Sequence, residues 1–376
     1  MNFPRRFAAS LMLIGCSMAI SCARAQAVKQ SDASSLIELV RQYGRPTQPG
    51  KDAQIQEPLE KSQASSIANT ETEGQYRSRM AAYLVDKNFD QLEKAAHEAR
   101  ASKSRFPGGV WTLYMFYQGV TNPIAGDQAS DSDWGVHFAT LKAWASAEPG
   151  SAAARIALAE SYLNYADKAR GSGYANTVSD TGWKLYAERN ALAASTLAEA
   201  AQLKEKCPYW YEVMQHVALG QGWEKPQAKE LFEQAVAFEP RFYHFYREYA
   251  NYLLPKWNGE EGEAGAFAEE ISNRIGGPEG KFVYFEIASL VRCQCDGDDS
   301  SADNLYWPKI KEGYAALGQL CGYSNLKTSR FAHMAVAAGD HDAAQHAFAV
   351  IGDDWDHSVW HSSQNFENAK LWADRQ

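Results

Sequence analysis

Apolar and small residues recur along most of the chain at the spacing of an α-helix, and prolines or glycines separate one such segment from the next. The stretch 221–240 shows this pattern well. Its Ala228, Phe232 and Ala235 are four and three residues apart, which places two small side chains and one large one on the same helical face. Pro240 follows and cannot continue a helix. The pattern predicts an all-α chain.

The order of small and large positions is typical of the second helix of a tetratricopeptide-type hairpin, where small residues let the partner helix approach and the large one fills the space between repeats. The C-terminal region carries the corresponding positions for both helices of a hairpin: Phe331, Ala332, Ala335, Gly339, Ala344, Phe348 and Ile351. Aromatic residues that can cap the last apolar face follow it: Trp355, Trp360, Phe366 and Trp372. We therefore predict a tetratricopeptide-like helical-hairpin array, an α-solenoid.

Composition and periodicity divide the chain into successive parts. Residues 1–25 have the residue order of a signal peptide, and residues 26–75 are rich in Gln, Ser, Thr, Pro and Glu, which predicts a disordered, flexible tether with one short helical pattern in it. Helical periodicity then defines a helical-repeat domain over 76–292 and a C-terminal hairpin with its cap over 293–376. Within the repeat domain, 170–182 is too rich in glycine and β-branched residues to stay helical, so we interpret it as an inserted loop.

The N-terminal residues predict export from the cytoplasm. Arg5-Arg6 precedes an apolar run from Phe7 to Ile20, and Ala23-Arg24-Ala25 supplies small residues for cleavage. Within the run, Leu13-Ile14-Gly15-Cys16 resembles the lipobox of bacterial lipoproteins, in which a lipid is attached to the cysteine. The sequence is compatible with both kinds of signal processing, so we expect a periplasmic or secreted protein, or an outer-membrane lipoprotein with its anchor at Cys16. No other segment is apolar enough to span a bilayer.

The charge balance limits the kinds of partner. The chain has 46 acidic and 37 basic residues, a net charge of −9, which argues against nucleic acid as the main partner. Hydrophobic residues make up 45% of the chain and aromatic residues 12%, so a large core can be built.

Cysteine usage agrees with an oxidising compartment. Cleavage behind Ala25 leaves four cysteines: Cys207, Cys293, Cys295 and Cys321. An even number suggests two disulfides, and four thiols permit three pairings. We expect at least one of Cys293 and Cys295 to pair with Cys321. A Cys-x-Cys redox pair and structural zinc are alternatives that the surrounding sequence does not favour.

The residues from about Phe89 to Ile287 resemble a bacterial family that is known only as domain of unknown function 4034. The motifs that carry the resemblance are Arg105-Phe-Pro-Gly-Gly-Val-Trp111, the run from Tyr165 to Ala175, Tyr209-Trp-Tyr-Glu-Val-Met214, Glu239-Pro240 and the run from Tyr249 to Trp257. The resemblance implies a helical-repeat protein, and it brings no assigned activity and no catalytic residues.

Two features of the sequence could bind a partner. Arg170 lies in the inserted loop, where a guanidinium could hold a carboxylate or phosphate. Aromatic residues near it suit the lining of a groove for an extended peptide or a sugar chain. The predicted partner-binding residues are Arg170, Tyr174, Trp183, Trp210, Tyr211, Trp223, Tyr246 and Trp257. The competing interpretation is that Arg170 pairs with a nearby acid and that the aromatic residues fill the core between repeats.

Metal sites and catalysis have weaker support in the sequence. Asp296, Asp298 and Ser300 begin like a calcium loop, but the glycine and the closing glutamate that such a loop requires are missing. His357 and His361 have the spacing of one helical turn, without the adjacent glutamate of a zinc-protease helix. No nucleophile motif or phosphate-binding loop is present either, so we expect no metal, no cofactor and no catalysis.

Together these observations favour an exported helical-repeat scaffold that binds a protein or peptide partner in the cell envelope. The alternative is a cell-envelope enzyme or carbohydrate-binding protein that uses the aromatic groove. The sequence leaves the identity of the partner, the oligomeric state, the disulfide connectivity and the choice between soluble and lipid-anchored forms open.

Overall fold

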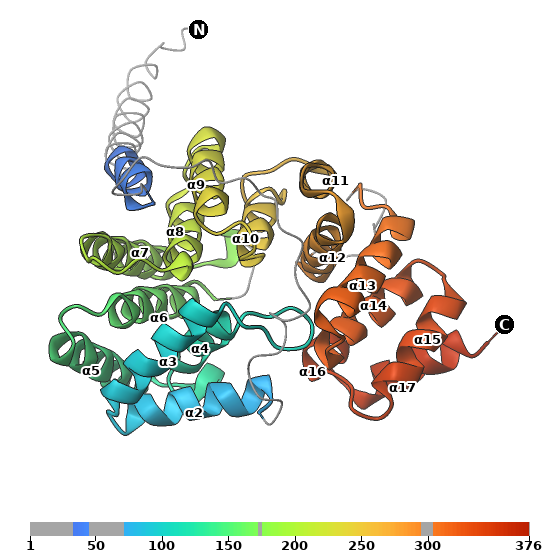
Figure 1. Ribbon diagram of the computed structural model, residues 1–376, viewed down its shortest axis with the longest axis horizontal. Helices are drawn as coiled ribbons and strands as arrows, with labels where there is room; N and C mark the ends of the chain where they lie inside the picture. The colour runs from blue at the N-terminus through green and yellow to red at the C-terminus, as the bar shows by residue number, and fades with distance from the viewer. Residues whose placement is uncertain (1–32, 45–70, 172–174, 295–303, 376) are drawn as a thin grey trace, which may run out of the picture.

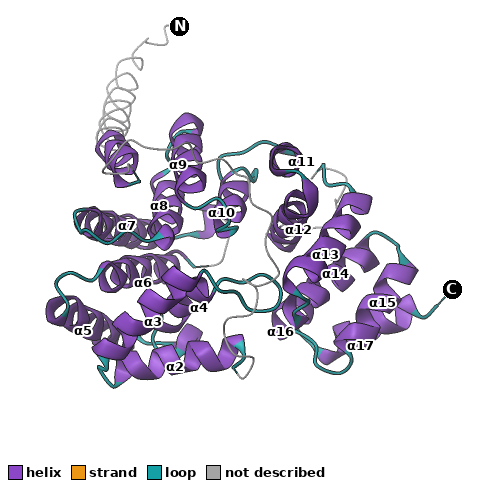
Figure 2. Cartoon of the chain, in the orientation of Figure 1, coloured by secondary structure: helices purple, strands orange, loops and turns teal. Residues whose placement is uncertain are grey.

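The structure is a computed structural model, and it describes residues 33–44, 71–171, 175–294 and 304–375, with the side chains of 293 and 294 excepted. Within these ranges the chain is all-α, and the only extended pairing is an isolated bridge between Arg105 and Trp111 (Figure 2). The predicted fold class is confirmed.

A helix over 33–43 precedes a series of labelled helices. In chain order these are α2 (Glu73–Val85), α3 (Phe89–Ser102), α4 (Thr112–Val120), α5 (Asp131–Ala147), α6 (Ala152–Arg170), α7 (Asp180–Ala201), α8 (Pro208–Gln221), α9 (Lys225–Phe238), α10 (His244–Tyr252), α11 (Glu263–Ile275), α12 (Gly277–Gln294), α13 (Trp307–Cys321), α14 (Asn325–Ala337), α15 (His341–Ile351), α16 (His357–Trp360) and α17 (Ser363–Ala373). Two 3-10 turns, Gly126–Gln128 and Ala175–Thr177, lie in the loops before α5 and α7.

The helices follow one another around an arc, with the N-terminal half on one side and α12 to α17 on the other (Figure 1). Most successive helices pack against each other, and every second helix also contacts the next of its kind, from α6 to α8, α10, α12 and α14. This is the packing that stacked helical hairpins require. The finer assignment as a tetratricopeptide-like solenoid stays a prediction.

The positions that predicted the array lie where the pattern requires. Phe232 is 2% exposed and stacks on Tyr249 with ring centroids 4.8 Å apart, while Ala228 and Ala235 are buried beside it. In the C-terminal hairpin Phe348 is 3% exposed and packs against Phe366 of the predicted cap. Large side chains therefore fill the spaces between the helices, as predicted.

Polar residues at the helix ends explain where helices begin. The Ser151 hydroxyl accepts a hydrogen bond from the backbone N–H of Ala154, 2.9 Å away, so Ser151 is the N-cap of α6. Asp340 caps α15 by accepting from the N–H of Ala343, and its second oxygen accepts from the indole N–H of Trp307. Gly339, just before it, has a φ of 69°, which favours glycine at this turn.

Part of the segment predicted to be a flexible tether is folded. Residues 33–43 form a helix whose Ala33, Ile37, Val40 and Tyr43 are buried in the core. The Tyr43 ring stacks on Trp210 at 3.9 Å, and Arg41 forms an ion pair with Glu230 on α9. The short helix expected from Ser35 to Tyr43 is therefore present, but it packs on the core, so the prediction of a flexible tether is wrong for these residues. The other residues of 26–75, apart from Gly44 and those from Glu71 on, lie outside the described part.

A loop between α3 and α4 reaches across to the far side of the arc (Figure 1). The backbone N–H of Gly108 donates to the carbonyl of Gly322 at 3.0 Å. Gly108 has a φ of 84°, and a Cβ there would lie 2.3 Å from the Ser324 hydroxyl, so only glycine fits without displacement. This loop, 103–111, joins the N-terminal helices to the C-terminal ones.

Candidate functional site

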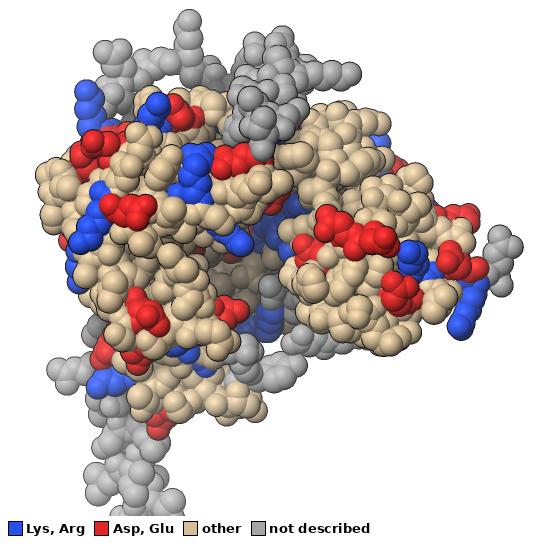
Figure 3. Space-filling model, turned by 90° about the horizontal axis from the view of Figure 1, so that it is seen from below, with Lys and Arg blue, Asp and Glu red and all other residues tan. Residues whose placement is uncertain are grey.

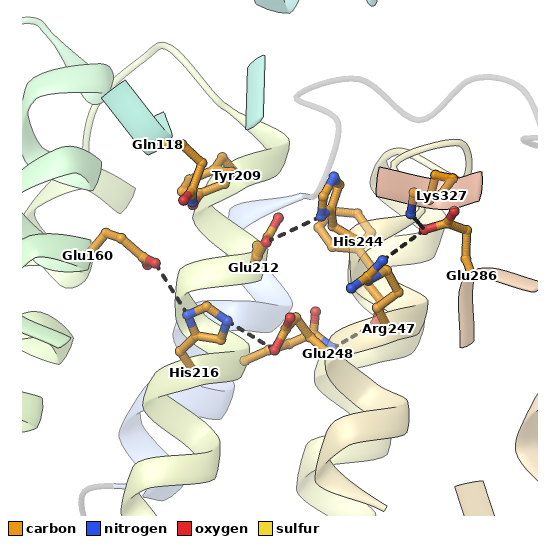
Figure 4. Close-up of polar contacts among 12 residues, drawn as sticks. Gln118, Glu160, Tyr209, Glu212, His216, His244, Arg247, Glu248, Glu286 and Lys327 are labelled. Carbon is orange, nitrogen blue, oxygen red and sulfur yellow. Dashed lines mark hydrogen bonds and ion pairs between the residues drawn. The ribbon is translucent and has the colours of Figure 1, made fainter. Parts of the chain in front are cut away.

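Charged side chains gather on the inner side of the arc, where alternate helices face one another (Figure 4). They come from α6, α8, α10, α12 and α14: Glu160, Glu212, His216, His244, Arg247, Glu248, Glu286 and Lys327. Two pairs, Glu212 with His216 and His244 with Glu248, are four residues apart on one helix, so each pair lies on a single helical face. We call these eight residues the inner cluster.

His216 is held between two carboxylates. Its Nδ1 lies 3.5 Å from Oε1 of Glu160, and its Nε2 lies 3.0 Å from Oε2 of Glu248. Burial alone would lower the pKa of His216, but the Glu248 and Glu160 carboxylates outweigh it and hold the pKa well above its ordinary value. At neutral pH this side chain is therefore an imidazolium, and it forms ion pairs with carboxylates on two other helices, α6 and α10.

Glu212 lies beside His216 without a comparable partner. The residue is 1% exposed, and its Oε2 accepts no hydrogen bond from the described residues. Its other oxygen lies 3.7 Å from Nδ1 of His244. Burial, with the charge of Arg247 adding to it, lowers the pKa of His244 well below its usual range, so this imidazole is neutral. Burial also raises the pKa of Glu212, with the Glu248 carboxylate adding to the effect. Glu212 is a buried acid without an ionic partner.

At the other end of the inner cluster, the buried carboxylate has cationic partners. Glu286 accepts from the guanidinium of Arg247 at 2.9 Å and from the ammonium of Lys327 at 2.5 Å. Lys327 is 2% exposed, and burial lowers its pKa to about 8 although Glu286 opposes the change. Two cations thus meet one carboxylate here, whereas three carboxylates surround the His216 imidazolium. The cluster has an acidic end and a basic end.

The acidic end remains open to water. The side chain of His216 is 30% exposed and that of Glu248 is 19% exposed, although helices surround both. Asp167 on α6 is exposed as well, and desolvation by the surrounding protein raises the pKa of its carboxyl group. On the face seen from below, the surface is hollowed between two lobes, with Lys and Arg on part of its walls (Figure 3).

The structure brings three of the sequence-predicted binding residues together. The Arg170 guanidinium lies between the Trp183 ring, 5.6 Å away, and the Trp257 ring, 5.2 Å away. Trp183 is 36% exposed, and the three side chains join α6, α7 and the loop before α11. Tyr174 lies outside the described residues.

The other predicted binding residues lie in the core. These are Trp210, Tyr211, Trp223 and Tyr246, each no more than 2% exposed. Trp210 donates its indole N–H to the Leu197 carbonyl at 2.9 Å, as buried tryptophans usually require. For these residues the structure agrees with the competing interpretation, that they fill the spaces between helices, so they do not line a groove.

The described cysteines are free thiols. Cys207 is buried and Cys321 is half-buried, and neither forms a disulfide with another described cysteine. The expected partners of Cys321, Cys293 and Cys295, have side chains outside the described part, so that pairing stays a prediction. The Asp296 to Ser300 stretch also lies outside it. His361 ends α16 with a φ of 60°, so His357 and His361 do not share a helical face as their spacing suggested.

Sequence reasoning missed the inner cluster, although a signal was present. Both Glu212-x-x-x-His216 and His244-x-x-x-Glu248 place two ligand-type side chains one helical turn apart. Each motif is embedded in aromatic residues, which drew the interpretation toward core packing or an aromatic groove.

Searches against protein-family models, curated proteins and solved structures found no match for this chain. The resemblance to the domain of unknown function 4034 family therefore stays a prediction. In the part of the chain that the structure describes, no helix combines the length and the apolar character needed to cross a membrane.

Proposed function

We propose that the chain is an exported helical-repeat scaffold that binds a protein or peptide partner in the cell envelope, with no catalysis of its own. The observation that carries the proposal is the inner cluster: charged side chains lie recessed where helical packing alone would place apolar ones, and two of them, His216 and Glu248, are partly exposed to water. Repeat arrays commonly bind their partners on the concave side. Export rests on the N-terminal residues, with cleavage behind Ala25 and lipid attachment at Cys16 as the two routes.

The charges favour a partner segment that carries lysine or arginine. Burying ionised groups costs free energy unless they are paired, so an unpaired acid such as Glu212 is not explained by stability. Carboxylates outnumber cations at the acidic end of the cluster, and the whole chain carries a net charge of −9. A basic side chain that enters the hollow would meet Glu160, Glu212 and Glu248 together.

The tryptophans beside Arg170 give the partner a contact outside the inner cluster. Trp183 is partly exposed and already stacked on a cation, so it can add an apolar or aromatic contact. The burial of Trp210, Tyr211 and Tyr246 weakens the alternative of a carbohydrate-binding aromatic groove, because that surface would need these rings exposed.

Site-specific photo-crosslinking tests the proposal. A photoreactive phenylalanine replaces Trp183 in one variant and Val350, which is 50% exposed on α15, in the control. Both are incubated with envelope extract that contains a chelator, and crosslinked proteins are identified by mass spectrometry. We expect one partner at position 183 and none at 350, with the yield reduced about tenfold by Glu248→Lys. Equal crosslinking at both positions, or a yield that Glu248→Lys leaves unchanged, would contradict the proposal.

A further inference from the structure

We propose that Glu212, His216 and Glu248 form a binding site for one divalent transition-metal ion, such as Zn²⁺ or Mn²⁺, with Glu160 supporting the histidine from behind. One ligand atom from each of the three residues lies within 4.8 Å of the other two. The residues come from α8 and α10, two helices that pack directly against each other. This inference goes beyond the proposed function and does not depend on it.

The distances suit a single ion. Three atoms no more than 4.8 Å apart have a common centre at most about 2.8 Å from each of them. Zinc lies about 2.0–2.2 Å from nitrogen and carboxylate oxygen ligands. Shifts of the ligand atoms by at most about 0.8 Å would close the difference, and glutamate has the rotatable bonds to make them.

The hydrogen bond on the far side of the imidazole is the kind that supports a metal-bound histidine. His216 turns Nε2 toward Glu248 and Nδ1 toward Glu160, on another helix, α6. Metal binding at Nε2 displaces the proton that the imidazolium carries there, and the remaining Nδ1–H group donates to the Glu160 carboxylate, which fixes the tautomer and the ring orientation. Metal-binding histidines in proteins almost always have such a carboxylate or carbonyl partner.

Glu212 supplies an independent reason for a cation. The residue is 1% exposed, its Oε2 has no hydrogen-bond partner among the described residues, and one of its oxygens lies within 4.8 Å of the ligand atoms of His216 and Glu248. An uncompensated buried carboxylate is costly, and a directly bound cation is the strongest compensation available. The nearest cationic side chain on α10, Arg247, is engaged by Glu286.

The ligand set indicates the class of ion. One imidazole nitrogen and two carboxylates suit zinc, manganese or iron, whereas calcium and magnesium favour oxygen ligands alone. His216 and Glu248 are partly exposed and Glu212 is not, so the ion would enter from the hollow and keep a coordination position open toward it. A water molecule could take that position.

Isothermal titration calorimetry on the mature chain, stripped with a chelator, tests the site. We expect one Zn²⁺ or Mn²⁺ per chain, with a dissociation constant of about 1 µM or less, and no comparable heat with Ca²⁺ or Mg²⁺. Glu212→Gln and His216→Gln should each weaken binding at least about 100-fold, and Glu160→Gln about 10-fold to 100-fold. Circular dichroism verifies that each variant is folded.

A matched control uses the other histidine pair. The double variant His357→Ala, His361→Ala should bind metal like the unaltered chain, because those side chains lie on the C-terminal side of the arc. The absorption of bound Co²⁺ gives a second measurement on the unaltered chain and should change with His216→Gln. Absence of binding at millimolar Zn²⁺, or binding that the control variant abolishes and Glu212→Gln leaves intact, would overturn the site. Partner crosslinking is measured with chelator present, so the two proposals can fail separately.

Discussion

Helices α8 and α15 both bury residues against neighbouring helices, but the kinds of residue that they bury differ. In α15 the buried residues are small or apolar, among them Ala344, Ala347 and Phe348, and the polar Asp340 lies at the helix start, where it caps. In α8 the buried positions include tyrosines, Trp210 and also the acid Glu212, in the middle of the helix. His216 follows one turn later on the same face.

The difference distinguishes residues that stabilise the fold from buried charged residues that the fold does not require. The α15 pattern satisfies packing and capping together, and nothing in it departs from what a stable helical hairpin requires. The α8 pattern departs at Glu212 and His216, and these departures meet those of α6 and α10 in one place (Figure 4). Local conflicts of this kind concentrate at functional sites. Substitutions in the α15 hairpin and in α8 test this contrast.

The largest effect is expected from Phe348→Ala. The side chain is 3% exposed and contacts the rings of Trp360 and Phe366, so its removal leaves a cavity under the C-terminal cap. The free energy of unfolding should fall by about 3–5 kcal/mol, measured by urea denaturation. The control Val350→Ala, on the exposed side of the same helix, should change it by less than about 0.5 kcal/mol. Similar losses for both variants would show that Phe348 does not hold the cap.

A smaller effect of opposite sign is expected from Glu212→Leu. Replacing a buried acid that lacks an ionic partner with an apolar side chain of similar size should raise the free energy of unfolding by about 1–2 kcal/mol in the presence of a chelator. Glu188→Leu on the exposed face of α7 is the control and should have little effect. A destabilised Glu212→Leu protein would mean that the acid is part of the packing, and the contrast with α15 would disappear.

The smallest effect is expected from Asp340→Ala, which removes the cap of α15. At pH 7 it should cost about 1 kcal/mol of unfolding free energy. Hydrogen bonding and charge from Lys311 lower the pKa of Asp340 to about 2, below its unfolded value, so this stabilisation is present above about pH 4 and is lost as the pH falls toward 2. Thermal unfolding of both proteins between pH 7 and pH 2 measures it. A stability difference that stays constant across this range would contradict the assignment. Asp340→Asn keeps an oxygen for the cap and should lose less.

The fold was predictable because its signals are local. Ala228, Phe232 and Ala235 lie within two helical turns, and their spacing alone determines which side chains share a face. The helix over 33–43 was harder, because it docks through Tyr43 onto Trp210, a residue far along the chain, and its neighbours are polar.

The candidate site was not predictable, because its members come together only when the helices stack. Glu160, Glu212 and Glu248 lie on three different helices, and each taken alone resembles an ordinary acid in a helix. Only the pairings of Glu212 with His216 and of His244 with Glu248 are visible in the sequence, and pairs at that spacing are common in helices without any site. The geometry of α6, α8 and α10 supplies the rest.

The loop at 103–111 bears on how the protein could deform. In arrays where each unit contacts only its neighbours, no contact between distant units resists a change in curvature. Here the backbone N–H of Gly108 donates a hydrogen bond to the carbonyl of Gly322, which connects two parts of the arc that are distant in sequence. This hydrogen bond restrains the two sides of the arc from moving apart at that point.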